Sequence, residues 1–180
     1  MSATLTSSRI SLRCFDVSDY AFLSHHAGDE DIVRWANRSL PPCEQSAVQW
    51  VEQVQELAQT GEAYWYAIVE KESDTVMGAV NLREIDTRTM TGTVGFWLAR
   101  EYRRQGFASE ALSSILNFAF EELRLHRVIA AVHEPNTGSA LLLAKAGFRL
   151  EGRSREAEVV NGLRCDVLWF GILRSEYSSS

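Results

Sequence analysis

The first third of the chain alternates between strand-like and helical patterns of apolar residues. Apolar side chains occupy every second position within Arg9–Phe15, which predicts a strand. From about Glu44 they recur at spacings of three and four, which predicts a helix that ends before Gly61, a residue suited to cap it. Between these elements, Asp16–Asn37 has the pattern of a broken helix, and Pro41-Pro42 ends it.

The middle of the chain carries three strand-like runs joined by short polar turns. They are Ala63–Glu70, Thr75–Ile85 and Thr91–Leu98. Connections this short join antiparallel neighbours, so the three runs predict a meander. The segment Thr93–Leu98 is apolar at consecutive positions, which indicates a strand that is covered on both faces.

The second half of the chain adds two helices and three strands. An apolar face at helical spacing predicts a helix over Gly106–Leu123, and Asn161-Gly162 is typical of a two-residue hairpin turn. A strand, a helix and a strand in succession require a crossover, hence one parallel pair in a mixed sheet. The fold class is therefore α/β, of the α+β type, and we expect residues 1–180 to form a single domain. The remaining predicted elements are Arg127–Val132, Asn136–Ala146, Phe148–Val160 and Leu163–Leu173.

Composition narrows the class of protein. Hydrophobic residues make up 46% and charged residues 23% of the 180, which is typical of a globular protein. No stretch has the pattern of a membrane helix or a signal peptide, so we expect a cytoplasmic protein without a membrane partner. The net charge of −6 disfavours nucleic acid as a partner. Cys14, Cys43 and Cys165 lack the spacing of metal ligands, so no metal site is expected.

Candidate chemistry gathers where Thr93–Leu98 runs into the next helix. The turn carries Arg103 and Arg104, and Gly106 lets the backbone approach a ligand closely. The first N–H groups of the following helix lack partners and favour a phosphate. Taken alone, this loop is equally consistent with a plain helix start. A dinucleotide-binding or Walker loop is disfavoured because the glycine patterns that these require are missing.

The wider sequence around this loop resembles a known family. Arg103-x-x-Gly106-x-Ala108 matches the pyrophosphate-loop pattern of the Gcn5-related N-acetyltransferases (GNAT), and Tyr102–Leu112 is similar to the RimJ/RimL branch of ribosomal-protein N-terminal acetyltransferases. Asn136-x-x-Ser139, followed by Lys145-Ala-Gly-Phe148, extends the resemblance, which covers roughly residues 9 to 174. It implies a GNAT fold, with a mixed, mostly antiparallel central sheet of about seven strands and helices on both faces, and acetyl-CoA as co-substrate. The residues that the resemblance assigns to acetyl-CoA are Phe96, Trp97, Leu98, Arg103, Arg104, Gln105, Gly106, Phe107, Ala108, Ser109 and Asn136.

The resemblance also places the donor between two strands. In this family acetyl-CoA lies where two parallel strands splay apart, and these correspond here to Thr93–Leu98 and Arg127–Val132. A bulge at Gly95 would expose backbone amides that can polarise the thioester carbonyl. The alternative for Gly95 is a close packing contact.

The reaction also needs a base, because an ammonium group cannot attack a thioester until it loses a proton. The resemblance assigns this role to Glu158 and assigns to Ser139 a hydrogen bond or a proton for the departing CoA thiolate. Glu158 equally fits a charged exterior strand face, and Ser139 and Asn136 equally fit helix caps. The other candidate carboxylates are Glu156, Glu84 and Glu134.

The acceptor surface is expected to come from the first helices and the last hairpin. Trp35, Asn37 and Arg38 lie in the segment that usually covers that cleft, although Trp35 also suits a core position. The RimJ/RimL resemblance favours the N-terminal amine of a ribosomal or other protein as acceptor, while a polyamine or an antibiotic amine stays open. A non-catalytic acyl-CoA-binding module and an interaction domain are the alternatives from other classes. The sequence leaves the oligomeric state open, with a homodimer as one option.

Overall fold

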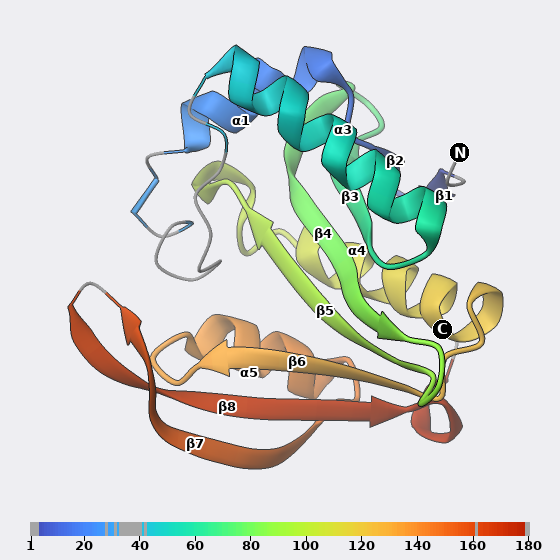
Figure 1. Cartoon of the computed structure of the whole chain (residues 1–180), viewed down its shortest axis with the longest axis vertical. Coiled ribbons are helices and arrows are strands. Elements are labelled where there is room, and N and C mark those ends of the chain that lie inside the picture. The colour runs from blue at the N-terminus through green and yellow to red at the C-terminus, as the bar shows by residue number, and fades with distance from the viewer. Residues whose placement is uncertain are drawn as a thin grey trace.

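The computed structural model describes residues 4–27, 29–30, 32, 41, 43–160 and 162–178. Eight strands form one sheet, in the order β1-β2-β3-β4-β5-β6-β8-β7. Helices cover both of its faces (Figure 1). The strands are β1 Leu5–Thr6, β2 Ile10–Cys14, β3 Tyr64–Glu70, β4 Thr75–Asp86, β5 Thr91–Leu98, β6 Arg127–His133, β7 Arg149–Val160 and β8 Leu163–Leu173. The helices are α1 Tyr20–His26, α3 Glu44–Thr60, α4 Phe107–Asn117 and α5 Thr137–Lys145.

The sheet is mixed and mostly antiparallel, as the resemblance implied. Only the β5–β6 pair is parallel among the strands described, and α4 supplies the crossover between them. Their pairing is short: it runs from Thr91↔Arg127 to Thr93↔Ile129 and then stops. Beyond Thr93 the two strands diverge, which Figure 1 shows as a widening gap between β5 and β6. This divergence is the splay that we expected between these two strands.

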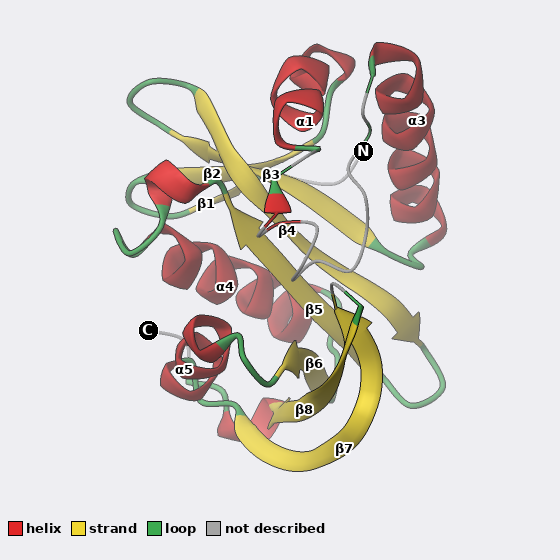
Figure 2. Ribbon diagram, turned by 90° about the vertical axis from the view of Figure 1, so that its left-hand side faces the viewer, coloured by secondary structure: helices red, strands yellow, loops and turns green. Residues whose placement is uncertain are grey.

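Two apolar clusters fill the space between the sheet and its helices. One joins α4 and α5 to one face, with Val94, Leu112 and Leu143 among its members. The other joins α1 and α3 to the opposite face, with Leu23 and Val51 among its members. The strand β5 contributes to both clusters, so the prediction that it is covered on both faces is confirmed. Figure 2 shows α4 and α5 on one side of the sheet and α1 and α3 on the other.

Several predicted boundaries are corrected by the structure. The sheet has eight strands rather than about seven, because β1 adds a two-residue edge strand. The long helix ends at Asn117 and continues as a π-helical turn, Phe118–Glu122. The bulge expected at Gly95 is wrong: Gly95 pairs in regular register with Asn81, and the irregularity between β4 and β5 lies between Arg83 and Asp86.

The glycine caps and the hairpin follow the expected pattern. Gly61 caps α3 with a φ of 77°, a left-handed conformation that glycine adopts without strain. Gly162, in the turn between β7 and β8, has a φ of 76°. Asn161, the other residue of this predicted turn, lies outside the described residues. No helix within the described ranges is long and apolar enough to cross a membrane.

Candidate functional site

A cavity of about 830 Å³ occupies the gap between the diverging strands. Its walls include the end of β5, from Val94 to Leu98, and the end of β6, from Ala130 to His133. These are the residues of the two strands that lie beyond their last parallel pair. The backbone groups of β5 that a regular sheet would pair with β6 therefore face this cavity. They are exposed by the loss of strand pairing and not by the bulge that we predicted.

The loop after β5 forms one end of the cavity. Arg103 is fixed there because its Nε donates a hydrogen bond to the carbonyl oxygen of Leu98, at 2.8 Å. Gly106 is the N-cap of α4 and has a φ of 90°, which only glycine adopts without strain. The first turn of α4 begins directly after it, so unpaired N–H groups point toward the loop. Five loop residues line the cavity: Arg103, Arg104, Gly106, Ala108 and Ser109.

Two residues predicted to bind acetyl-CoA do not line this cavity. Gln105 is exposed, and its side-chain nitrogen donates to the carbonyl oxygen of Glu101 at 2.7 Å. Phe107 is buried in the core cluster beneath α4. Their side chains therefore shape the loop, while Phe96, Trp97 and Leu98 of β5 do line the cavity, as predicted.

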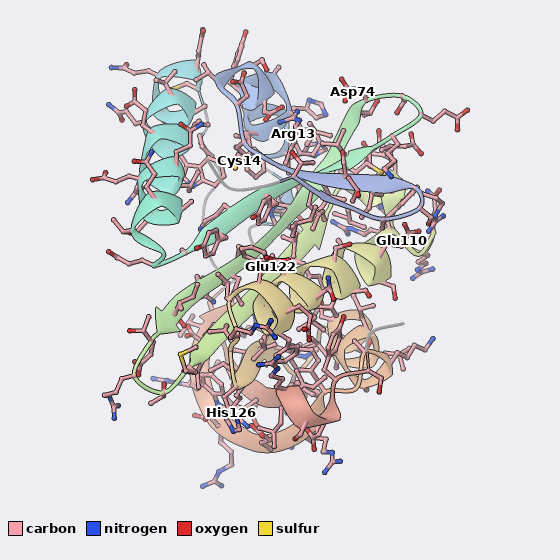
Figure 3. The ribbon with its side chains drawn as sticks, turned by 90° about the vertical axis from the view of Figure 1, so that its right-hand side faces the viewer. Arg13, Cys14, Asp74, Glu110, Glu122 and His126 are labelled. Carbon is pink, nitrogen blue, oxygen red and sulfur yellow. The ribbon has the colours of Figure 1, made fainter. Side chains whose placement is uncertain are left out.

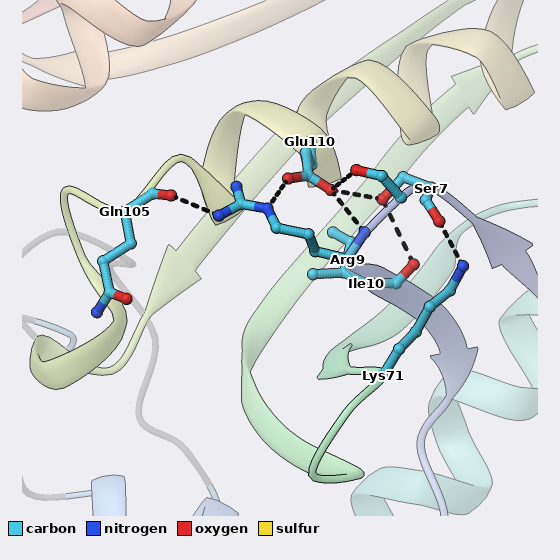
Figure 4. A network of polar contacts seen from close by, with 7 residues as sticks. Ser7, Arg9, Ile10, Lys71, Gln105 and Glu110 are labelled. Atoms are coloured by element: carbon cyan, nitrogen blue, oxygen red, sulfur yellow. Dashed lines mark hydrogen bonds and ion pairs between the residues drawn. The ribbon is translucent and has the colours of Figure 1, made fainter.

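An ion pair that the sequence did not reveal supports the loop from behind. Glu110, on α4, accepts hydrogen bonds from Ser7 Oγ at 2.8 Å and from Arg9 Nε at 2.5 Å. Arg9 Nη1 in turn donates to the carbonyl oxygen of Gln105 at 3.0 Å, and its guanidinium lies 4.5 Å from the ring centre of Phe107. Figure 4 shows this network, which ties the start of β2 to the loop.

The charge state of Glu110 fits this supporting role. Partial burial would by itself raise the pKa of Glu110, but hydrogen bonds from Ser7 and Arg9 hold it below the ordinary value. The carboxylate is thus ionised when it binds Arg9. Figure 3 shows Glu110 in the first turn of α4 and Glu122 at the far end of the π-helical turn that continues it. Arg9 and Glu110 are 101 positions apart, so no local pattern could have linked them.

Asn136 and Ser139 both line the cavity, at the start of α5. The side-chain oxygen of Asn136 accepts a hydrogen bond from the backbone N–H of Ser139 at 3.2 Å. Asn136 is therefore the N-cap of α5, one of the two roles that we considered for it. Capping leaves its side-chain nitrogen available to a ligand.

The candidate carboxylates lie away from the cavity lining. Glu158 is half-buried on β7, in register with Cys165 of β8, and does not line the cavity. Glu156 is exposed, and Glu134 forms an ion pair with Arg153 at 3.1 Å. Glu84 accepts a hydrogen bond from Thr93 Oγ1 at 2.8 Å, near the point where β5 and β6 part. The role of Glu158 as base stays a prediction.

The opposite end of the cavity is aromatic. Its described walls come from Ile32, from α3 and from three adjacent strands, and Trp50 packs edge-on against Trp65 with ring centres 5.6 Å apart. Among the lining residues in the described part of the chain, none is Asp or Glu. Trp35, Asn37 and Arg38, which we expected to cover this cleft, lie outside the described residues. We call this end of the cavity, where the acceptor is expected, the acceptor half; its described residues are Ile32, Trp50, Trp65, Asn81, Arg83, Gly95 and Trp97.

The burial of His26 reflects the same aromatic packing. Its ring lies 4.6 Å from that of Phe22 and 6.3 Å from that of Trp97, measured between ring centres. Burial, and then the neighbouring charge of His25, lower the pKa of His26 below its ordinary value. His26 is thus biased toward its neutral form behind the acceptor half.

Comparison with known proteins gives a consistent result. Residues 9–149 match the protein family described as Acetyltransferase (GNAT) domain. The chain is 30% identical to an uncharacterized N-acetyltransferase, p20, of Bacillus licheniformis over 175 residues, which are 97% of this chain and 98% of that protein. Among solved structures, it resembles the ribosomal-protein-S5-alanine acetyltransferase of Vibrio fischeri, with a TM-score of 0.87, 23% identity and coverage of 98% and 100% of the two chains. It also resembles spermidine N-acetyltransferase of Vibrio cholerae in complex with CoA and spermine, with a TM-score of 0.83, 24% identity and coverage of 95% and 99%.

Proposed function

Because this chain belongs to the GNAT acetyltransferase family and is an N-acetyltransferase with acetyl-CoA as its donor, we propose that its acceptor is the N-terminal amine of a protein. The chemistry common to the family leaves the acceptor open, since the relatives include enzymes named for ribosomal proteins and for spermidine. The choice between these acceptors depends on the acceptor half of the cavity.

The observation that carries the proposal is the lack of a carboxylate among the described residues that line the cavity. Its described lining includes Arg83, Arg103, Arg104 and Lys145 and no carboxylate. A polyamine carries several strongly hydrated ammonium groups, and burying them is costly unless carboxylates pair with them. A peptide N-terminus brings a single amine, followed by neutral backbone and side chains. The cavity therefore favours the peptide.

The neighbourhood of Arg83 sharpens this argument. Its Nη1 forms an ion pair with Glu84 at the outer end of the acceptor half. This pairing offsets part of the charge of Arg83, and no other described residue of the acceptor half carries a charge. Trp50, Trp65 and Ile32 then provide apolar contacts for the first side chain of a peptide.

The loop end of the cavity suits the donor. Arg103, Arg104 and the start of α4 would bind the pyrophosphate of acetyl-CoA, since guanidinium groups and unpaired helix N–H groups both favour phosphate oxygens. The pantetheine arm would then run along the unpaired edge of β5. A backbone N–H there would donate to the thioester oxygen and stabilise the charge that develops on it.

Transfer would proceed directly in a ternary complex. The amine nitrogen attacks the thioester carbon, the C–S bond breaks, and the CoA sulfur leaves as a thiolate that takes up a proton. One proton of the attacking nitrogen is released to a base, for which Glu158 stays the predicted residue. Ser139 is the predicted hydrogen-bond partner of the thiolate, and it lies in the cavity lining. Holding both substrates in this geometry accounts for much of the rate.

A thiol-release assay tests the acceptor class. The purified protein is given acetyl-CoA with peptides that begin with Ala or Ser, with the same peptides blocked at the N-terminus, or with spermidine. We expect release with the free peptides and not with the blocked ones, and a higher kcat/KM for the peptides than for spermidine. Faster turnover of spermidine would overturn the proposal. Binding of CoA without release for any amine would indicate a non-catalytic module.

A further inference from the structure

We propose that Asn81 binds the attacking amine of the acceptor, with its side-chain oxygen accepting a hydrogen bond from the amine N–H. This inference deepens the proposed function and rests on it for the identity of the acceptor. The argument starts from one polar group that the fold leaves without a partner.

Asn81 is only 5% exposed, yet its Oδ1 finds no hydrogen-bond partner within the described part of the chain. A buried amide oxygen without a partner is costly, because the group has lost its water and gained nothing in exchange. Most such groups in folded proteins are paired, so an unpaired one calls for an explanation. In this protein the residue that carries it also lines the cavity.

The register of the sheet places Asn81 beside the reacting centre. Asn81 lies between Trp65 of β3 and Gly95 of β5, its two cross-strand neighbours, and all three residues line the acceptor half of the cavity. Gly95 comes two residues after Thr93, where β5 loses its partner β6. The amide of Asn81 is therefore next to the stretch of β5 along which the thioester would lie.

Gly95 leaves the side-chain amide of Asn81 uncovered because it has no side chain of its own. A Cβ atom at position 95 would lie 3.1 Å from Asn81 Oδ1 and 3.2 Å from Nδ2, closer than a side chain normally packs. The close packing contact that we considered for Gly95 thus exists, and its partner is the amide of Asn81. Any larger residue at position 95 would press on the amide and cover it from the cavity side.

The amide can present its oxygen to a ligand. The terminal torsion of an asparagine is broad and roughly two-fold, so a half-turn exchanges the oxygen and the nitrogen at little cost. A neutral amine has two N–H groups and one lone pair. One N–H can stay on Asn81 throughout, because the product amide keeps one hydrogen while the other leaves with the base.

The consequence is a kinetic signature. A hydrogen bond that is present in substrate, transition state and product contributes uniformly to binding, so its loss raises the KM of the acceptor more than it lowers kcat. In this arrangement Trp50 and Trp65, which line the cavity, would contact the first side chain of the acceptor while Asn81 binds its amine. Asn81 is accordingly a binding residue for the nitrogen and not the base.

The test compares Asn81→Leu and Asn81→Asp with the wild type, using initial rates over a range of acceptor and acetyl-CoA concentrations. We expect Asn81→Leu to raise the acceptor KM by about tenfold or more, with the acetyl-CoA KM within about twofold of the wild-type value. Because Leu removes a buried unpaired amide, the melting temperature should stay the same or rise. Asn81→Asp keeps an acceptor oxygen and should retain more acceptor affinity than the Leu variant.

Two further variants keep the result interpretable. Asn117→Leu makes the same substitution at an exposed site on α4 and should change neither KM. Gly95→Ala leaves Asn81 in place but covers its amide, so it should raise the acceptor KM in the same direction. An unchanged acceptor KM in Asn81→Leu would overturn the inference, as would an Asp variant as impaired as the Leu variant.

The outcomes also separate this inference from the proposed function. If the wild type acetylates another amine and no peptide, the proposed function fails and the Asn81 variants are measured with that amine. If it acetylates peptides and Asn81→Leu has a normal acceptor KM, only the inference fails. If it acetylates no amine at all, both fail.

Discussion

The donor half and the acceptor half of the cavity differ in how far along the chain their residues are spread. The donor half draws five lining residues from the single stretch Arg103–Ser109, with Asn136 and Ser139 at the next helix start. The acceptor half combines Ile32 and α3 with one or two residues from each of β3, β4 and β5. A compact loop suits a ligand that is the same across a family, whereas scattered single residues can change one at a time with the acceptor.

The largest expected effect lies in the donor half. Replacing Arg103 and Arg104 together with Ala removes two guanidinium groups from the cavity lining. Charge-assisted hydrogen bonds contribute about 1.5–3 kcal/mol each, so the KM for acetyl-CoA should rise by about a hundredfold or more. Kinetics with acetyl-CoA as the varied substrate measure this. Arg100→Ala, at an exposed site before the loop, is the control, and an unchanged KM in the double variant would show that the pyrophosphate binds elsewhere.

The second prediction concerns the support behind the donor loop. Glu110→Gln removes the charge that holds Arg9 against the loop, so the acetyl-CoA KM should rise by about tenfold and the unfolding free energy should fall by about 1 kcal/mol. Glu122→Gln, at the exposed end of the π-helical turn that continues α4, is the matched control (Figure 3). Acceptor KM values should not change, and a change confined to them would contradict the division into two halves.

The pH dependence of Glu110 gives an independent check. Its folded pKa lies below the ordinary value of 4.5, so the ionised carboxylate stabilises the fold at pH values above 4.5. That stabilisation is lost as the pH falls from about 4.5 through the lowered folded pKa. The stability difference between wild type and Glu110→Gln should therefore shrink at acidic pH, as measured by denaturant unfolding at a series of pH values.

The same contrast explains what the sequence could predict. The loop, the strand before it and the helix after it are contiguous, so motif and periodicity located these three elements, and the family resemblance implied the splayed strand pair. The network of Ser7, Arg9 and Glu110 joins residues about a hundred positions apart, and only the folded chain brings them together. The strand β1 was missed because two residues are too few for an alternating pattern.

The acceptor half could not be predicted because its chemistry depends on the register of the sheet. In the sequence, Asn81 is an ordinary polar residue within a predicted strand. Only the folded sheet, where it pairs with Trp65 and Gly95, shows that its oxygen is buried beside the cavity. The expected bulge at Gly95 was wrong for a related reason. A glycine in a strand can mark either a bulge or a close contact, and the amide of Asn81 makes it the latter.

A third prediction addresses acceptor charge. Arg83→Glu replaces a cation with a carboxylate at the outer end of the acceptor half and removes its ion pair with Glu84. The ratio of kcat/KM for spermidine to that for a peptide should rise by about fivefold at low salt and less at high salt. The acetyl-CoA KM should stay constant. If the ratio did not change at either salt concentration, charge in this half would not select the acceptor. A polyamine would then be as consistent with the cavity as a peptide.

The smallest expected effect comes from His26, packed behind the acceptor half against Phe22 and Trp97. Its folded pKa lies below the ordinary value of 6.5, so the unfolded chain takes up a proton first as the pH falls. As the pH falls, the contribution of His26 to stability should therefore begin to decrease near pH 6.5. It should decrease no further once the pH is below the folded pKa of His26. Unfolding measured from pH 8 to pH 5 should show a shallower decrease in His26→Gln than in the wild type. The charge of Arg103 in the donor loop also lowers the pKa of His26, but less than burial and His25 do. The acetyl-CoA KM should therefore follow the His26 curve at most weakly, and a pH profile of the same amplitude would mean that the two halves are coupled through Trp97.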